Sequence, residues 1–160
     1  MSAPTSSHAY GIGLIAVIIG TAVGISYYQL YFVPEYNAKP HFDDPKITNP
    51  SDTTTVHIAV GSAIGPDQSQ YFVPAIQTVQ LGVNNLVIWK NDDLPNVHFV
   101  TIDPKSDYKD RYSGDLDSSP IKAGDSFTFL FTQEGTVKYY CKVHPWMTGE
   151  IDVVHGAKTS

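Results

Sequence analysis

Residues 135–149 read GTVKYYCKVHPWMTG and combine a strand pattern with a metal-binding pattern. Val137 and Tyr139 alternate with polar neighbours up to Cys141, the only cysteine of the chain, which indicates a β-strand that ends at that residue. His144 and Met147 follow Cys141 at C-x2-H-x2-M spacing. A thiolate, an imidazole and a thioether suit copper, with methionine as a weak axial ligand. The stretch therefore predicts a strand that leads into a copper-binding loop.

A trigonal copper site of this type needs a second histidine. His98 follows an apolar strand that ends at Trp89 and is the best placed of the remaining histidines. The alternative interpretation is a buried structural cysteine beside unrelated surface residues, and a lone cysteine can also be free or pair with another chain. Histidines without a nearby Cys or Met are expected to be ordinary polar residues: His8, His57 and His155.

From Thr53 onward the sequence has the pattern of an all-β domain. Short apolar segments with strand-like alternation lie at residues 56–60, 76–81, 86–89, 127–131 and 137–141, with glycines between or beside them. Short strands separated by turns, with no helical repeat, indicate an antiparallel β-sandwich. Residues 103–120 interrupt the pattern with five Asp residues. We expect this segment to be a long surface loop, and such loops are often functional.

Residues 10–33 read YGIGLIAVIIGTAVGISYYQLYFV, and no Asp, Glu, Lys or Arg precedes Glu35. An apolar run of this length predicts one transmembrane helix, with aromatic residues near one end, as at a membrane interface. A cleaved signal peptide is the alternative, but the run is long for one and has no basic segment before it. Gly20 and Gly24 form a G-x-x-x-G pattern that would allow a helix–helix contact.

The rest of the chain completes the predicted organisation. Residues 1–9 form a short tail, residues 34–52 a proline-rich linker, residues 53–155 the β-domain and residues 156–160 a C-terminal tail. His41 with Asp43 and Asp44 is more typical of a solvated acidic linker than of a metal site. The net charge of -6 and the pI near 5.3 argue against nucleic-acid binding, which requires clustered basic residues.

A series of motifs, in this order along the chain, resembles the cupredoxin family of type 1 (blue) copper proteins. The motifs are Phe72-x-Pro74-x-Ile76, Val87-x-Trp89-x-Asn91-x-Asp93, His98, Ser119-x-Ile121-x-x-Gly124, Phe129-x-Phe131 and the residues from Gly135 to Gly149. The match covers roughly residues 54 to 154. The short ligand loop resembles that of amicyanin, and the arrangement with its anchor resembles the membrane-tethered plastocyanin-like proteins of archaea.

The resemblance implies an all-β, Greek-key β-sandwich preceded by one transmembrane helix. It also implies one copper ion that alternates between Cu(I) and Cu(II), with His98, Cys141 and His144 as equatorial ligands and Met147 as the axial ligand. Two features depart from the family pattern. Either the loop after Trp89 is one residue longer, so that residues 98–101 match the family's His-x-Val-Thr, or the first ligand is displaced; we choose the longer loop because no other histidine lies nearby. The polar residue that follows the first histidine in relatives, and helps to tie the ligand loops together, is Phe99 here. Since hydrogen bonds around the ligands tune a site, this departure bears on rigidity and reduction potential.

Three classes of function are compatible with these residues. The first is a non-enzymatic carrier of single electrons, which exchanges them with a respiratory complex or another redox protein. The second is a small copper oxidoreductase acting on nitric oxide or oxygen, which needs an open coordination position. The third is a copper carrier or a copper-binding subunit of a larger membrane complex. A binuclear CuA centre is excluded because the position of its second cysteine is Val137. We expect the copper domain on the outer side of the cytoplasmic membrane.

Overall fold

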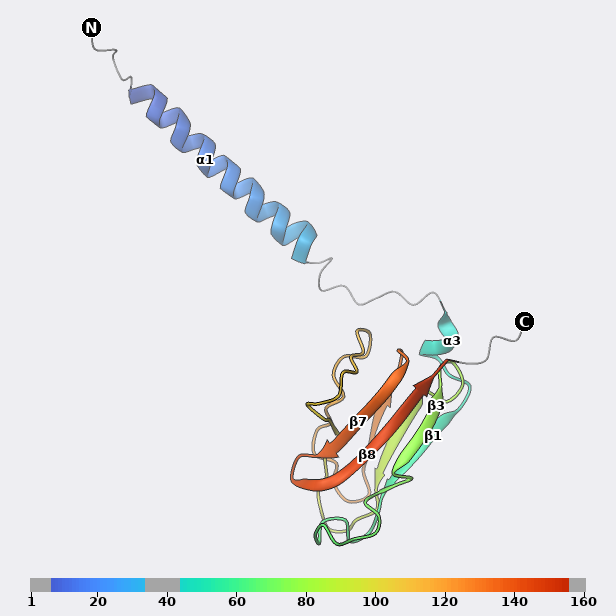
Figure 1. The fold of residues 1–160 in the computed structure, drawn as a ribbon. Coiled ribbons are helices and arrows are strands. Elements are labelled where there is room, and N and C mark those ends of the chain that lie inside the picture. Colours follow the sequence, from blue (N-terminus) through green and yellow to red (C-terminus); the bar gives the residue numbers. More distant parts are fainter. Residues whose placement is uncertain (1–6, 34–43, 156–160) are drawn as a thin grey trace. The chain divides into compact units, whose positions relative to one another are not determined.

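A computed structural model describes residues 7–33 and 44–155, which belong to two compact units, Met1–Lys39 and Pro40–Ser160 (Figure 1). Residues 1–6 and 156–160 of the predicted tails and residues 34–43 of the predicted linker lie outside the described residues.

The described residues of the first unit, 7–33, form one apolar helix. Helix α1 spans Ser7–Tyr27 and continues into a π-helical segment, η1, at Tyr28–Phe32. The stretch Gly11–Phe32 has 22 residues and is long and apolar enough to cross a membrane, and its side chains are exposed in the structure. Aromatic rings stack in pairs near its end, Tyr27 on Tyr31 and Tyr28 on Phe32. Nothing lies within 4 Å of the Cβ position at Gly20 or Gly24, so this face of the helix is open.

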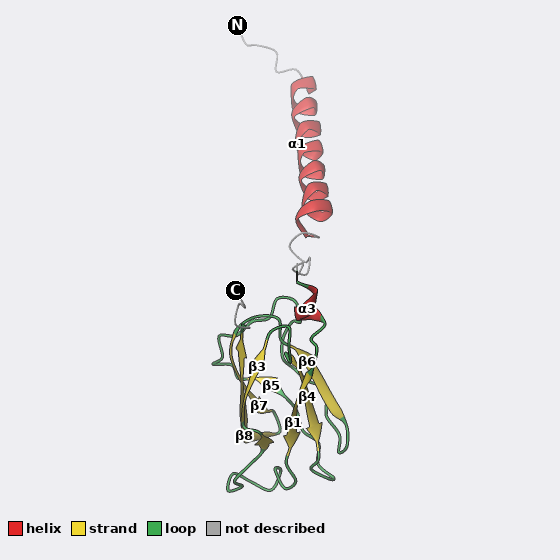
Figure 2. Cartoon of the chain, turned by 90° about the vertical axis from the view of Figure 1, so that its right-hand side faces the viewer, coloured by secondary structure: helices red, strands yellow, loops and turns green. Residues whose placement is uncertain are grey.

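The second unit is a sandwich of two four-stranded sheets (Figure 2). The first sheet has the order β2 (Phe72–Val73), β1 (Thr53–Ile58), β4 (Leu86–Asn91) and β6 (Ser126–Leu130). The second has the order β3 (Ile76–Gln80), β8 (His144–Val154), β7 (Gly135–Cys141) and β5 (Thr101–Ile102). The predicted all-β fold, a Greek-key β-sandwich after an apolar helix, is confirmed.

The expectation that the strands are antiparallel throughout is wrong for two pairs. Strand β1 pairs with β4 in parallel, and β3 pairs with β8 in parallel. Periodicity reports which side chains face the core, but it carries no information about the direction of a neighbouring strand. The remaining pairs, including the β7–β8 hairpin, are antiparallel.

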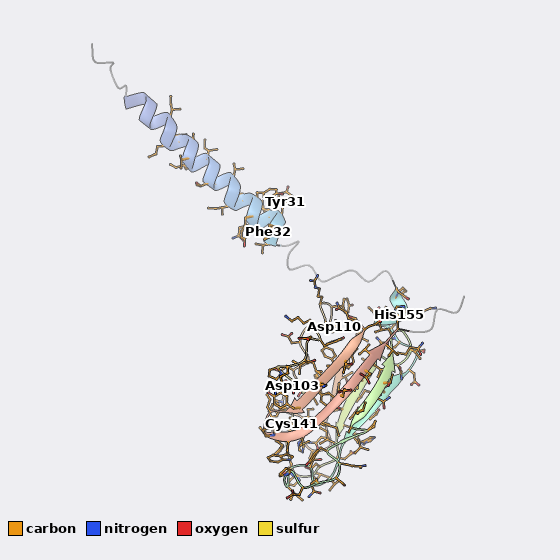
Figure 3. All side chains as sticks on the ribbon, in the orientation of Figure 1. Tyr31, Phe32, Asp103, Asp110, Cys141 and His155 are labelled. Atoms are coloured by element: carbon orange, nitrogen blue, oxygen red, sulfur yellow. The ribbon has the colours of Figure 1, made fainter. Side chains whose placement is uncertain are left out.

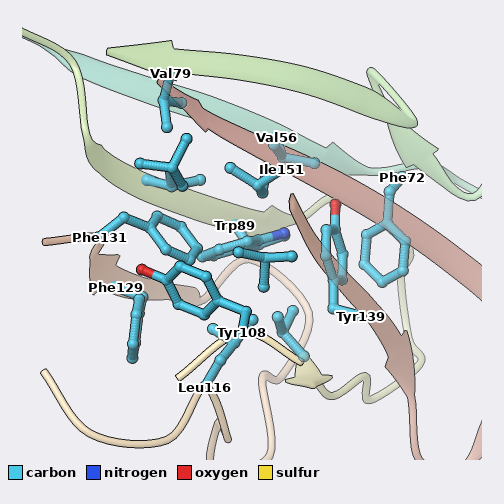
Figure 4. Close-up of a cluster of buried hydrophobic side chains, with 14 of the residues drawn as sticks. Val56, Phe72, Val79, Trp89, Tyr108, Leu116, Phe129, Phe131, Tyr139 and Ile151 are labelled. Carbon is cyan, nitrogen blue, oxygen red and sulfur yellow. The ribbon is translucent and has the colours of Figure 1, made fainter. Parts of the chain in front are cut away.

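Large aromatic side chains fill the space between the sheets (Figure 4). The rings of Tyr139 and Phe131 both meet that of Trp89 edge to face, at centroid distances of 5.5 and 6.3 Å. Strand β1 alternates buried and exposed side chains along its whole length, as a strand with one face on the core does. Gly149 lies opposite Tyr139 in the β7–β8 ladder. A Cβ atom at Gly149 would lie 2.3 Å from Cζ of Tyr139, so the packing requires glycine there.

Residues 44–52, within the predicted linker, contact the sandwich. Asp44 caps a helical turn, α3 (Pro45–Thr48), by accepting a hydrogen bond from the backbone N–H of Lys46. Ile47 packs against the core, and its carbonyl accepts a hydrogen bond from Asn85. This contact joins the start of the second unit to the sandwich.

The acidic segment 103–120 is less of a surface loop than its composition suggests. Tyr108, Asp110 and Leu116 are buried. The carboxylate of Asp110 accepts hydrogen bonds from the hydroxyl of Tyr108 and from both the backbone N–H and the hydroxyl of Thr132. Burial and the neighbouring Asp110 raise the pKa of Tyr108. Asp110 therefore anchors the segment, whereas Asp107 and Asp115 are exposed.

Candidate metal centre

Three of the predicted ligands meet at the closed end of the β7–β8 hairpin, where Cys141 is labelled in Figure 3. Cys141 is the last residue of β7, and His144 is the first residue of β8. His98 comes from the segment between β4 and β5, where its backbone exchanges two hydrogen bonds with Ile121. Antiparallel pairing of β5 with β7 places the His98 segment beside the end of β7, so that donors 43 residues apart in the sequence meet.

The donor atoms of these three residues form a triangle. Sγ of Cys141 lies 3.6 Å from Nδ1 of His144 and 3.8 Å from Nδ1 of His98, and the two nitrogens are 3.2 Å apart. Donors bonded at about 2.0 Å (nitrogen) and 2.3 Å (sulfur) to one ion in a trigonal plane would be roughly 3.5–3.7 Å apart. The triangle therefore has the size that one metal ion requires.

Burial differs among the three donors. His98 and Cys141 are fully buried, whereas His144 is partly exposed. Burial, reinforced by the nearby His144, holds the pKa of His98 below its ordinary value, although Asp93 acts in the opposite direction. A neutral imidazole is the form that binds metal, so the His98 ring is in its ligand form near neutral pH.

Backbone and side-chain hydrogen bonds tie the ligand segments together. The N–H of Phe99 donates to Sγ of Cys141 at 3.3 Å, a contact that depends on the backbone and not on a polar side chain. Asn91, fully buried at the end of β4, donates to the carbonyls of Asn96 and Ile121 and accepts from the N–H of Asp93. Although Phe99 has no polar side chain, its backbone N–H therefore still joins the His98 segment directly to Cys141.

Asp93 is hydrogen-bonded to His98, the first predicted histidine ligand. Its Oδ2 atom accepts a hydrogen bond from Nε2 of His98 at 2.9 Å, and both side chains are buried. Burial alone would raise the pKa of Asp93, but hydrogen bonds from Gly61, His98, Ala63 and Asn96 together hold it below the ordinary value. The resemblance motif contained Asp93, but sequence reasoning assigned it no role.

Comparison with solved structures identifies the architecture. A purple cupredoxin from Nitrosopumilus maritimus matches with a TM-score of 0.52 and 26% identity, over 63% of this chain and 99% of that chain. A copper-containing nitrite reductase from Thermus scotoductus SA-01 matches with a TM-score of 0.50 and 18% identity, over 73% of this chain but only 28% of that chain. A variant of amicyanin in its oxidised state gives a TM-score of 0.49 and 22% identity, over 68% of this chain and 89% of that chain.

The chain contains a cupredoxin fold. No protein-family model matches the sequence, and no curated protein does. The family resemblance inferred from the motifs is confirmed by the structural match. The three-donor cluster lies in the part of this cupredoxin domain that the hairpin and the His98 segment enclose.

Met147, the predicted axial ligand, is fully buried in the cupredoxin domain. It is the fourth residue of β8, which begins at His144. The backbone of the ligand loop is a two-residue turn between Cys141 and His144, followed by an irregularity at residues 145–147, after which the ladder resumes with Tyr140 opposite Thr148. Met147 as an axial ligand remains a prediction.

Trp146 links the ligand loop to the segment that follows β1. Its ring lies 5.3 Å from that of His144, and its Nε1–H donates to the carbonyl of Ser62 at 3.1 Å. The same segment donates to Asp93 through the N–H groups of Gly61 and Ala63. Sequence reasoning missed this segment, since it has neither ligands nor strand periodicity.

Exposed apolar side chains accompany this network. Each lies next in the sequence to a residue of the hydrogen-bond network or of the predicted site: Val60, Ile64, Leu94, Val97 and Val143.

Two histidines outside the site have acidic partners, His57 with Asp92 and His155 with Glu134. Both agree with their prediction as ordinary polar residues. The side chains of His8 and His41 lie outside the part of the chain that the structure describes.

Proposed function

We propose that this protein is a membrane-anchored, mononuclear type 1 copper protein that carries single electrons. The observation that carries the proposal is the triangle of one sulfur and two nitrogen donors, with edges of 3.2, 3.6 and 3.8 Å. A trigonal His2Cys set with a weak axial methionine is the donor set of copper electron-transfer sites. When bound, copper supplies a one-electron couple between Cu(I) and Cu(II).

The residues around the triangle suit a carrier because they restrict movement. His98 is held by Asp93 on one side and by two backbone hydrogen bonds to Ile121 on the other. Sγ of Cys141 accepts a hydrogen bond from the N–H of Phe99, and Cys141 pairs with His144 across a two-residue turn. A scaffold that fixes donors in this way needs little rearrangement between oxidation states, which favours fast electron exchange.

The partly exposed ring of His144 is the proposed point of electron exchange, since His98 and Cys141 are fully buried. We define the apolar rim as Val60, Ile64, Leu94, Val97 and Val143, which are exposed side chains next to the site network. An apolar surface of limited area suits brief encounters, as between redox partners. The proposed partner is a redox protein or a respiratory membrane complex.

The helix supplies the proposed anchor. Residues 10–33 would cross the lipid bilayer once, with the copper domain on the outer side of the cytoplasmic membrane and the N-terminal tail inside. The length and apolar composition of Gly11–Phe32 support this arrangement. The open face at Gly20 and Gly24 would allow a contact with a second helix.

The decisive experiment is a visible and electron-paramagnetic-resonance spectrum of the detergent-solubilised protein after addition of Cu(II) sulfate. We expect one copper per chain and an intense thiolate-to-copper band that disappears on reduction and returns on reoxidation. A copper-loaded protein without that band would refute the type 1 assignment.

A second candidate function is a small copper oxidoreductase or a copper-binding subunit of a larger complex. The likeness to part of a nitrite reductase concerns the fold alone. The two functions differ in turnover: a carrier accepts one electron per copper from a reductant and stops. An oxidoreductase would consume nitric oxide, nitrite or oxygen continuously with excess reductant, which a gas or nitrite electrode measures.

A further inference from the structure

Asp93 is a buried carboxylate at which four hydrogen bonds converge. Its Oδ1 atom accepts from the N–H of Gly61 at 2.7 Å. Its Oδ2 atom accepts from the N–H of Ala63, the amide of Asn96 and Nε2 of His98, at 3.2, 3.3 and 2.9 Å. The residue is 1% exposed. A buried charge is retained only where such partners compensate for the loss of water.

The contact with Asp93 determines which nitrogen of His98 carries the proton. An ionised carboxylate can only accept hydrogen bonds, so Nε2 of His98 must be protonated. In the neutral ring Nδ1 is then unprotonated, and its lone pair is available toward Cys141 and His144, whose donor atoms lie at 3.8 and 3.2 Å. The opposite tautomer would place a proton where a ligand atom is needed.

We propose that Asp93 is a positioning residue that holds His98 in its metal-binding tautomer and, through its negative charge, lowers the reduction potential of the copper site. The inference rests on the proposed function. A carboxylate partner makes a ligand imidazole more basic, and a nearby negative charge favours the more highly charged ion. Both effects stabilise Cu(II) relative to Cu(I).

The number and direction of the donors explain why the residue is a carboxylate. An asparagine offers one acceptor oxygen and one NH2 group. If the asparagine oxygen faced His98, its NH2 group would face the N–H of Gly61, and two donors would meet. In the reverse orientation the NH2 group would face the N–H groups of Ala63 and His98. Asp93→Asn thus removes the charge and at least one hydrogen bond with little change in volume.

The three donors other than His98 fix the carboxylate itself. Gly61 and Ala63 belong to the segment after β1, and the carbonyl of Ser62 between them accepts the Nε1–H of Trp146. That segment is therefore hydrogen-bonded to a neighbour of each predicted histidine ligand. Asp93 is the neighbour of His98, and Trp146 is the neighbour of His144. The position of Asp93 is set by the fold and does not depend on the ligand loop.

The test compares Asp93→Asn with Asp92→Asn in the full chain, solubilised in detergent and loaded with Cu(II) sulfate. Asp92 is the adjacent carboxylate and pairs with His57, which is not a ligand. The two variants therefore make the same change in charge one residue apart. In Asp93→Asn we expect Cu(II) affinity to fall roughly ten- to hundredfold with a smaller loss for Cu(I). A tenfold difference between oxidation states raises a one-electron potential by about 59 mV. Asp92→Asn should shift it much less.

Equal potentials for the two variants would overturn the inference while leaving the proposed function intact, provided that the wild type shows its thiolate-to-copper band. Absence of that band in the copper-loaded wild type would instead refute the proposed function. The two failures are therefore distinguishable.

A measurement on the wild type covers the case in which Asp93→Asn does not fold. Nitrogen chemical shifts of the copper-free protein, labelled with 15N-histidine, report the tautomer of His98. We expect a neutral ring protonated at Nε2, with slow exchange of that proton because both side chains are buried. A ring protonated at Nδ1 would overturn the inference.

Discussion

The Nδ1 atoms of His98 and His144 face each other at 3.2 Å across 46 residues of sequence. One histidine is held by a buried carboxylate and the other begins a strand. Their separation matches two corners of a trigonal site, and the third corner is the single sulfur of Cys141.

Replacement of the thiolate gives the first prediction. Cys141→Ser removes the sulfur but keeps the size of the side chain, so the sandwich should remain folded while the visible band is lost. The absorption and circular-dichroism spectra check both results. A Cys141→Ser protein that kept its colour would contradict the assignment of the sulfur ligand.

Loss of the first histidine gives the second prediction. His98→Ala should abolish the normal copper spectrum because one corner of the triangle is removed. His57→Ala is the matched control, since His57 is paired with Asp92 away from the site and its loss should leave the spectrum unchanged. Equal spectra for the two variants would mean that His98 is not a ligand.

The axial position gives the third prediction. Met147 is fully buried, and Met→Leu conserves volume, so Met147→Leu should cost less than about 1.5 kcal/mol of stability. The visible band should remain, and the reduction potential should rise because a sulfur donor to Cu(II) is lost. Voltammetry of the purified variant checks the shift. An unchanged potential would exclude Met147 as the axial ligand.

The apolar rim gives the fourth prediction. Ile64→Ser should slow electron exchange with the native partner at every ionic strength, because it removes apolar contact area and no charge. Ile76→Ser is the control: both isoleucines are exposed, at 77% and 63%, but Ile76 pairs with Glu150, six residues along β8 from His144. Stopped-flow rates with the partner measure the difference. Equal slowing by both variants would contradict docking at the rim.

Charge steering is separate from the apolar rim and calls for its own variant. Asp107→Asn with Asp115→Asn should change mainly the exchange rate at low salt, since surface charges act through a screened field. Asp110 is unsuitable for this purpose because its carboxylate is buried and bonded to Thr132.

Alkaline pH gives the fifth prediction. Burial raises the pKa of Tyr108 above its ordinary value, so the unfolded state releases this proton first as pH rises. Below about pH 10 the neutral hydroxyl therefore makes its full contribution to the free energy of unfolding. Above that pH the free energy of unfolding falls by up to about 1.4 kcal/mol per pH unit. In urea unfolding of the fragment from Pro40, Tyr108→Phe should reduce this slope. An identical slope would show that the hydroxyl ionises equally in both states.

The extent of prediction from sequence differs between the parts of the molecule. Alternation located β1, β4 and β7 within a few residues, because each has one face on the core and periodicity records that directly. The spacing of Cys141, His144 and Met147 located the loop that follows β7, but it did not predict that His144 pairs with Cys141 across a two-residue turn. Apolar length located the helix of the first unit.

Features that depend on contacts between distant segments were not predictable in this way. The bond from Gly61 to Asp93 spans 32 residues, and no local period encodes it. Composition suggested that Asp110 was solvated, whereas its partner Thr132 lies 22 residues away. The parallel pairing of β1 with β4 likewise depends on how the chain crosses between sheets.

Cys141 and His144 are paired residues at the closed end of one antiparallel hairpin. The backbone pairing that forms this hairpin also brings their donor atoms to 3.6 Å. The donor positions of Cys141 and His144 are therefore part of the strand pairing itself, so we expect the folded sandwich to present them before an ion binds. On this basis we expect metal binding to be a single bimolecular step, with a rate that rises linearly with metal concentration.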